Sequence, residues 1–159
     1  MNININAIDN IINGIKKESA LFLRDDMQLD VIGLKDISNY SSKKYFSSIK
    51  LSNANHNFII IINIDDNLFN YLFNQFFYDG VDEDEKEELV NALPDEIINN
   101  IVGLAIRNFS TKYKNLVLGL PLELNQKQIL EIINTNISKS CEIVTKTDIL
   151  VCTVVKLLD

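Results

Sequence analysis

The run Phe58–Ile62 constrains the fold of this chain most, because it consists of one phenylalanine followed by four isoleucines. Aromatic and β-branched residues pack well on a pleated sheet, so the run predicts a strand in the centre of a sheet. It is far too short to cross a membrane, which takes about 20 apolar residues. An asparagine-rich segment, residues 53–57, joins it to an alternating apolar and polar segment at Tyr45–Leu51. Together these features predict a β-hairpin.

In the rest of the chain, the spacing of apolar residues alternates between that of a helix and that of a strand. Apolar residues recur at helical spacing in residues 4–22, 66–78 and 82–113, whereas 29–34, 116–118, 142–145 and 149–157 have strand-like patterns. Residues 126–140 fit either a helix or a strand. No linker-like composition divides the chain, so we expect a single domain over residues 1–159. The fold class predicted is α+β, with helices packed on a mostly antiparallel β-sheet.

Composition and charge exclude several classes of function. The chain has 159 residues, 47% hydrophobic and 23% charged, which is typical of a soluble globular domain with a real core. Its net charge of −7 argues against nucleic acid and anionic membranes as partners and favours basic protein surfaces. The N-terminus does not resemble a signal peptide, so we expect a cytoplasmic protein. In such a chain Cys141 and Cys152 are expected to be buried, unreactive thiols rather than a disulfide.

The helix predicted at 82–113 has one polar side. Its acidic start, Asp82–Glu88, suits a helix N-terminus and is expected to be solvated. Pro94 should either kink this helix or start a second one. At about 100° per residue, Ile98, Ile101, Val102, Ala105 and Phe109 form an apolar stripe, and Glu96, Asn99, Asn100, Gly103 and Arg107 cluster opposite it. A glycine inside a helix costs about 1 kcal/mol relative to alanine, so Gly103 indicates close approach by another backbone or protein, unless it is a tolerated surface glycine.

The absence of common catalytic motifs narrows the kinds of site that this chain can contain. The sequence has no Cys/His metal-ligand cluster and no glycine-rich phosphate loop, and its only histidine, His56, falls in the predicted turn. We therefore expect no metal site and interpret His56 as a surface turn residue. Glu96 and Asn99 remain, three residues apart and hence neighbours on a helix. An amide can hold a water in line with a phosphoryl group, and a carboxylate, which phosphate repels, can contact a lysine beside it.

The same spacing occurs elsewhere, because the chain is rich in isoleucine and asparagine. Glu131–Asn134 repeats the four residues Glu-Ile-Ile-Asn, and Asp9 and Asn13 come close to the pattern but lie four residues apart. We expect the segment around Asp9 to be a core amphipathic helix rather than a second site. The first copy differs from Glu131–Asn134 by its apolar stripe on the far side, its long helical context and the glycine four residues after its asparagine, where the second copy has Ser138 and an ambiguous period.

The pattern Glu96-x-x-Asn99-x-x-x-Gly103, preceded by Ala92 and the acidic helix start, resembles the signature helix of the CheX-type chemotaxis phosphatases, relatives of CheC. The order of the predicted elements matches as well, including a strand that leads to Pro121. The resemblance implies a CheC/CheX-like α/β sandwich, typically a homodimer, that hydrolyses the phospho-aspartate of a CheY-like response regulator in chemotaxis or two-component signalling. It also implies that Asn99 positions the attacking water and that Glu96 contacts a lysine of the receiver.

The resemblance further implies that Mg²⁺ belongs to the partner receiver domain and that this chain has no cofactor of its own. Asn100, Gly103 and Arg107 then form a partner-binding face beside the catalytic pair. Two functions stay open, an active phosphatase and a non-catalytic receiver-binding or scaffold domain of the same fold. An α+β domain with an unrelated function is the third alternative.

Overall fold

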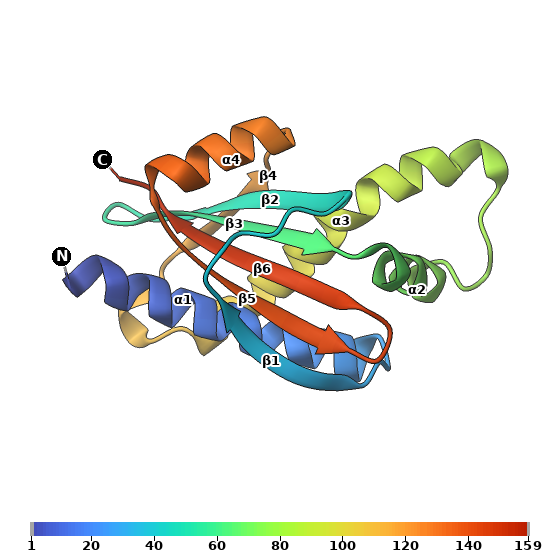
Figure 1. Cartoon of the computed structure of the whole chain (residues 1–159), viewed down its shortest axis with the longest axis horizontal. Coiled ribbons are helices and arrows are strands. Elements are labelled where there is room, and N and C mark those ends of the chain that lie inside the picture. Colours follow the sequence, from blue (N-terminus) through green and yellow to red (C-terminus); the bar gives the residue numbers. More distant parts are fainter. Residues whose placement is uncertain (1, 159) are drawn as a thin grey trace.

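The computed structural model describes residues 2–158, which form a six-stranded antiparallel sheet with helices on both faces (Figure 1). The strand order is β1-β5-β6-β3-β2-β4. The strands are β1 (Val31–Ile37), β2 (Tyr45–Ser52), β3 (Asn57–Ile64), β4 (Val117–Pro121), β5 (Ile137–Thr145) and β6 (Ile149–Lys156). The helices are α1 (Asn2–Leu21), α2 (Asp66–Phe76), α3 (Glu83–Ala105) and α4 (Gln126–Thr135). The predicted α+β class is confirmed.

The strand predicted at Phe58–Ile62 is central, since β3 lies between β6 and β2. It pairs antiparallel with β2, as the hairpin prediction requires. Alternate side chains of β3 enter two cores, because neighbouring residues of a strand point to opposite faces. Ile60 and Ile62 belong to the large core under α1 and α3, while Ile59 and Ile61 pack with Ile129 of α4 on the other face. An unbroken run of isoleucine therefore suits a strand that is covered on both faces.

Helices α1 and α3 cover the same face of the sheet and touch where α1 has a glycine. A Cβ atom added to the buried Gly14 would lie 2.6 Å from two ring carbons of Phe109, just beyond α3. Next to this contact, Glu18 of α1 is only 3% exposed. Its carboxylate accepts hydrogen bonds from Arg107 Nη2 at 3.1 Å and from Asn108 Nδ2 at 2.8 Å. Close packing and the buried Glu18 carboxylate, bonded to Arg107 and Asn108, thus fix the end of α3 against α1.

Helix α3 runs unbroken through Pro94, so no second helix begins there. The apolar residues on both sides of the proline, Leu93 and Ile97, are buried in the core and hold the helix together across the missing hydrogen bond. The α-helix ends at Ala105, and the remainder of the segment predicted as helical consists of the 3₁₀ turns Ile106–Asn108 and Thr111–Tyr113.

Residues 126–140, whose sequence fits either a helix or a strand, form a helix followed by a strand. Asn125 begins α4 with a capping box, in which its side chain accepts from the Gln128 N–H and Gln128 Oε1 accepts from the Asn125 N–H. Ile129, Ile132 and Ile133 of α4 pack on the sheet. Strand β5 then starts at Ile137.

The connection from β1 to β2, residues 38–44, crosses the sheet from one edge towards the other, as Figure 1 shows. It is held by Asn63 of β3, whose side chain is fully buried. Asn63 Oδ1 accepts from the Lys43 N–H at 2.9 Å, and its Nδ2 donates to the Tyr40 hydroxyl at 2.9 Å. A buried amide with both ends bonded is stabilising where an unpaired one would cost about 1–3 kcal/mol.

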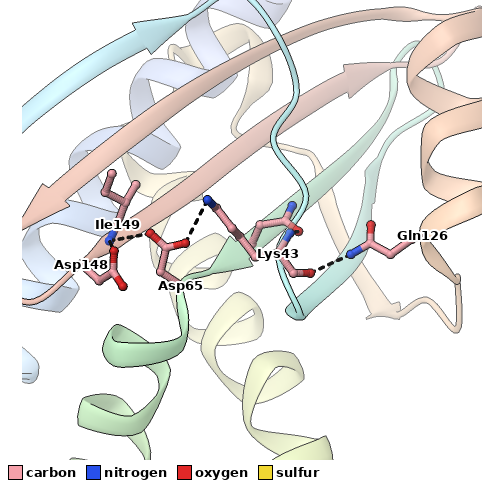
Figure 2. A network of polar contacts seen from close by, with 6 residues as sticks. Lys43, Asp65, Gln126, Asp148 and Ile149 are labelled. Atoms are coloured by element: carbon pink, nitrogen blue, oxygen red, sulfur yellow. Dashed lines mark hydrogen bonds and ion pairs between the residues drawn. The ribbon is translucent and has the colours of Figure 1, made fainter.

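A polar network continues from this connection to the start of α2 (Figure 2). Lys43 Nζ lies 2.9 Å from Asp65 Oδ1, and its carbonyl accepts from Gln126 Nε2 at 2.8 Å. The Ile149 N–H donates to Asp65 Oδ2 at 3.2 Å and to Asp148 Oδ1 at 3.1 Å. Asp65 occupies the N-cap position of α2, but its side chain makes no capping hydrogen bond and is directed into this network. The network joins the connection, α2, α4 and the β5–β6 turn.

Gly14→Ala should destabilise the fold by about 1–3 kcal/mol, because the buried Phe109 ring has to move to admit a methyl group. The matched control is Gly103→Ala in α3. There the nearest atom to an added Cβ is Leu118 Cδ2 at 3.7 Å, so the better helix former should stabilise by up to about 1 kcal/mol. Chemical denaturation measures both, and equal effects of the two substitutions would contradict the tight α1–α3 contact.

Asp148→Asn should raise the free energy of unfolding at neutral pH. A hydrogen bond to Asp65 raises the pKa of Asp148 above its ordinary value of 3.8, so ionising Asp148 costs folding free energy as the pH rises above that value. An amide removes this cost and keeps an oxygen for the Ile149 N–H. The gain should fade near about pH 3, where the carboxyl is protonated in both states. Thermal unfolding at the two pH values, with the exposed Asp26→Asn as control, checks this, and lower stability at neutral pH would contradict it.

Candidate functional site

Glu96 and Asn99 both lie exposed on α3, on the side that faces away from the sheet. The helix beneath them is anchored by the predicted apolar stripe, of which every member is buried: Ile98, Ile101, Val102, Ala105 and Phe109. Ile97, directly after Glu96, is fully buried as well. The predicted division of α3 into a core side and a polar side is thus confirmed.

A hydrogen bond from the sheet fixes this part of α3. Ser47 of β2 is 4% exposed, and its Oγ donates to Asp95 Oδ1 at 2.5 Å, one residue before Glu96. A hydrogen bond to a carboxylate is stronger than one between neutral groups, so this contact ties α3 to β2. Neither residue stands out in the sequence, because Ser47 looks like an ordinary polar member of an alternating strand. Its burial depends on α3 lying across β2, which no local pattern reveals.

The three residues of the predicted partner-binding face have different surroundings. Asn100 is half-buried and Gly103 is exposed. Within the described chain, nothing comes nearer to an added Cβ at Gly103 than Leu118 at 3.7 Å, so the close approach predicted there does not come from this chain. Arg107 lies in the 3₁₀ turn after α3 and binds Glu18, although 64% of its side chain is exposed.

The two similar sequence patterns lie elsewhere. Glu131 and Asn134 are exposed on α4, on the opposite face of the sheet from α3. Asp9 pairs with Lys139 of β5, and Asn13 is exposed beside it. The apolar residues of α1 are buried as predicted for a core amphipathic helix, namely Ile8, Ile11, Ile12 and Ile15. The α4 copy thus shares the local arrangement on α3, with both polar residues exposed on a helix whose other side packs on the sheet. It differs in covering the opposite face of the sheet and in having Ser138 where α3 has Gly103.

His56 lies half-buried in the β2–β3 turn, near the rings of Phe58 and Tyr113. Burial and the nearby charges of Lys156 and Lys112 lower the pKa of His56, so it is neutral near pH 7. This confirms the prediction of a turn residue, although the ring is packed rather than fully solvated.

The two cysteines are free and buried, as predicted, and face each other across β5 and β6. A hydrogen bond with Cys152 and burial raise the pKa of the Cys141 thiol far above its ordinary value. Among residues 2–158, no three His, Cys, Asp or Glu side chains converge to hold a metal ion.

One helix within the described residues, Glu83–Asn108, is long and apolar enough to cross a membrane by length and composition. It includes α3, whose most apolar side chains, such as Ile97 and Ile101, lie in the core against the sheet. One such helix is weak evidence for a membrane span, because core helices of soluble proteins pass the same test of length and composition.

Comparisons with known proteins give matches at the level of structure. No protein-family model matches the sequence, and no curated protein matches it either. A complex of CheX with CheY, BeF₃ and Mg²⁺ from Borrelia burgdorferi aligns with a TM-score of 0.68 at 19% identity, covering 92% of this chain and 97% of that one.

Two further solved structures have the same fold as this chain. A CheC-like superfamily protein from Shewanella sp. PV-4 has a TM-score of 0.68 at 11% identity, over 94% of this chain and 98% of the other. The chemotaxis protein CheX from Vibrio vulnificus has a TM-score of 0.66 at 14% identity, over 92% and 96%. At these identities the likeness concerns the fold. The chain therefore has the fold of the CheX- and CheC-like chemotaxis proteins, as the motif on α3 and the order of elements predict.

Proposed function

We propose that this chain is a phosphatase for the phospho-aspartate of a CheY-like receiver domain. The observation that carries the proposal is the exposed pair Glu96 and Asn99 on the outer side of α3, within a CheX-like fold. The Borrelia CheX is solved together with a CheY, which supports a receiver as the partner of this chain too. In this proposal residues 1–159 act as one CheX-like domain in the cytoplasm.

Asn99 has the chemistry to position water. Its amide is uncharged, so a phosphoryl group does not repel it, and it can both donate to and accept from one water molecule. A water held in line with the phosphorus can attack it, while the aspartate carboxylate leaves and inorganic phosphate forms. This gain comes from orientation, so it needs a rigid platform. The buried stripe of α3 and the Ser47–Asp95 hydrogen bond supply that rigidity.

Glu96 has the charge to bind a lysine beside the phosphate. It lies one turn before Asn99, so both side chains can enter the same receiver site. The net charge of −7 favours approach of a basic surface. We place the Mg²⁺ with the receiver, as the presence of CheY and Mg²⁺ in the Borrelia complex supports, so this chain contributes no metal ligand.

Asn100, Gly103 and Arg107 extend the proposed contact with the receiver. Gly103 leaves α3 without a side chain at an exposed position, which allows a partner backbone to come close. Arg107 is joined to Glu18, so only the exposed part of its guanidinium is available for a partner.

A homodimer is part of the proposal. The edge strands β1 and β4 carry exposed apolar side chains, Ile32 on β1 and Leu120 on β4, and such edges favour pairing with another chain. Sedimentation velocity should detect a dimer at micromolar concentration. A species with the mass of one chain over the whole concentration range would contradict it.

The alternative is a receiver-binding or scaffold domain that lacks catalysis and docks through the same side of α3. Binding alone would leave the lifetime of the phospho-aspartate unchanged or lengthen it. Catalysis shortens that lifetime at amounts of this protein far below those of the receiver, so one measurement separates the two functions.

Asn99→Ala should lower the rate constant for dephosphorylation by about a hundredfold, the scale expected for one positioned catalytic group. The measurement is loss of phosphate from the CheY-like receivers of the source organism after phosphorylation by a small-molecule donor. The matched control is Asn134→Ala, which changes the same Glu-Ile-Ile-Asn pattern on α4 and should retain full activity. Full activity of Asn99→Ala would refute the assignment of the site.

Glu96→Ala should act mainly on docking, because the carboxylate is proposed to contact a lysine and not the water. We expect KM to rise about tenfold and the rate constant at saturation to change much less, as for loss of one charge pair at an interface. Glu131→Ala on α4 is the control. A large drop in the saturated rate constant with unchanged KM would assign Glu96 to the chemical step instead.

A further inference from the structure

A hollow of about 340 Å³ opens between the end of α2 and the first half of α3. Its lining is apolar except for one residue, the proposed catalytic Glu96: Phe76, Phe77, Leu89, Ala92, Leu93 and Glu96. We call it the α2–α3 hollow. Its volume is at the lower end of the range for binding pockets, roughly 300–1,000 Å³. A concave, mostly apolar hollow with one polar residue at its side has the form of a small binding pocket, and here that residue belongs to the proposed site.

Most of the side chains that line the hollow are only partly buried in the core. Phe76 and Phe77 are half-buried, with ring centroids 6.4 Å apart, and Leu89 opposite them is half-buried too. Ala92 is exposed, and its small side chain leaves the hollow open. Leu93 at the base is 1% exposed and belongs to the core. An apolar group entering the hollow would therefore meet two aromatic rings and an aliphatic wall.

The hollow is continuous with the proposed site along one side of α3. Residues seven apart lie nearly above one another on a helix, so Glu85, Ala92 and Asn99 form one row. Leu89, Glu96 and Gly103 form the row beside it. Each row passes from the first half of the helix to the proposed receiver contact. At a rise of 1.5 Å per residue, the hollow lies roughly 10 Å from Asn99 along the helix.

Exposed acidic side chains precede the hollow along α3. The first half of α3 projects beyond the sheet in Figure 1, and its acidic residues Glu83, Asp84, Glu85, Glu87 and Glu88 are exposed. Glu85 and Glu88 stand one turn before Leu89 and Ala92, at the rim. Lys86, the basic residue of this segment, instead lines a different hollow with Tyr45. The rim is thus complementary to lysine and arginine.

We infer that the α2–α3 hollow receives an apolar side chain of the receiver, from a surface segment that carries lysine or arginine next to it. This inference rests on the proposed function, since it extends the contact made by Glu96 and Asn99. The apolar side chain then lies roughly 10 Å from Asn99 along the helix, as the spacing on α3 requires. In this inference the contact is equally strong in the bound state and in the transition state, so it sets affinity and the choice of receiver and leaves the chemical step unchanged.

Ala92→Trp tests the inference, because the indole fills the hollow from an exposed position and removes no buried contact. We expect KM for the phosphorylated receiver to rise at least tenfold while the rate constant at saturation stays within about twofold, the pattern for loss of uniform binding. The affinity for the BeF₃-activated receiver, measured by calorimetry, should fall by the same factor. Asn91→Trp is the matched control, on the same helix but turned well away from the hollow, and should match the wild type.

A second variant addresses the rim. Glu85→Lys combined with Glu88→Lys should lower the association rate constant at low salt by about tenfold, and the difference should shrink as salt screens the charges. This variant leaves the apolar walls intact, so it separates the charge of the rim from the filling of the hollow.

The outcomes distinguish the inference from the function on which it rests. If the wild type speeds dephosphorylation and Ala92→Trp has an unchanged KM, the inference is wrong and the function stands. If the wild type does not speed dephosphorylation, the function is wrong, and calorimetry then decides about the hollow. Equal affinity of the wild type and Ala92→Trp, or no binding by the wild type, overturns the inference. Loss of self-association in Ala92→Trp would assign the hollow to a second copy of the chain and also overturn it.

Discussion

The burial of one side of α3 against the sheet is the interaction on which the rest of the structure depends. Ile97, Ile98, Ile101 and Val102 are completely removed from solvent, and each contributes roughly 1.5–3 kcal/mol of hydrophobic stabilisation. Because a helix has two sides, fixing this side determines where the other side points. The same contacts therefore anchor the helix and hold Glu96 and Asn99 exposed in a defined orientation. Three further contacts hold α3 in place: the close packing at Gly14, the hydrogen bonds of Glu18 and the Ser47–Asp95 bond.

Much of the fold could be predicted because its strongest signals are local. The isoleucine run of β3, the alternation of β2 and the 3.6-residue period of α3 each depend on neighbours in sequence. The edge strand β1 was predicted at 29–34 but lies at Val31–Ile37, because an edge strand with exposed apolar residues has a weak alternating pattern. The sequence does not decide between helix and strand for residues 126–140, because isoleucines suit both α4 and the start of β5, which this segment contains.

The features that could not be predicted from the sequence depend on contacts between distant segments. The crossing of residues 38–44 over the sheet, the burial of Ser47 and Asn63, and the α2–α3 hollow all arise only once the elements are packed. Pro94 shows the same limit in another form, since burial of the residues around it outweighs the local cost of a proline within a helix. The repeat Glu131–Asn134 shows why spacing alone does not define a site. It has the same four residues as the copy on α3, but on a helix that covers the opposite face of the sheet.

The measurement that tests the central claim most directly is the lifetime of the phospho-aspartate on a CheY-like receiver of the source organism, with and without a catalytic amount of this protein. We predict that the wild-type protein shortens this lifetime and releases inorganic phosphate with many turnovers per molecule. A lifetime that stays unchanged or becomes longer, in the presence of measurable binding to the receiver, would contradict a phosphatase and identify a binding domain.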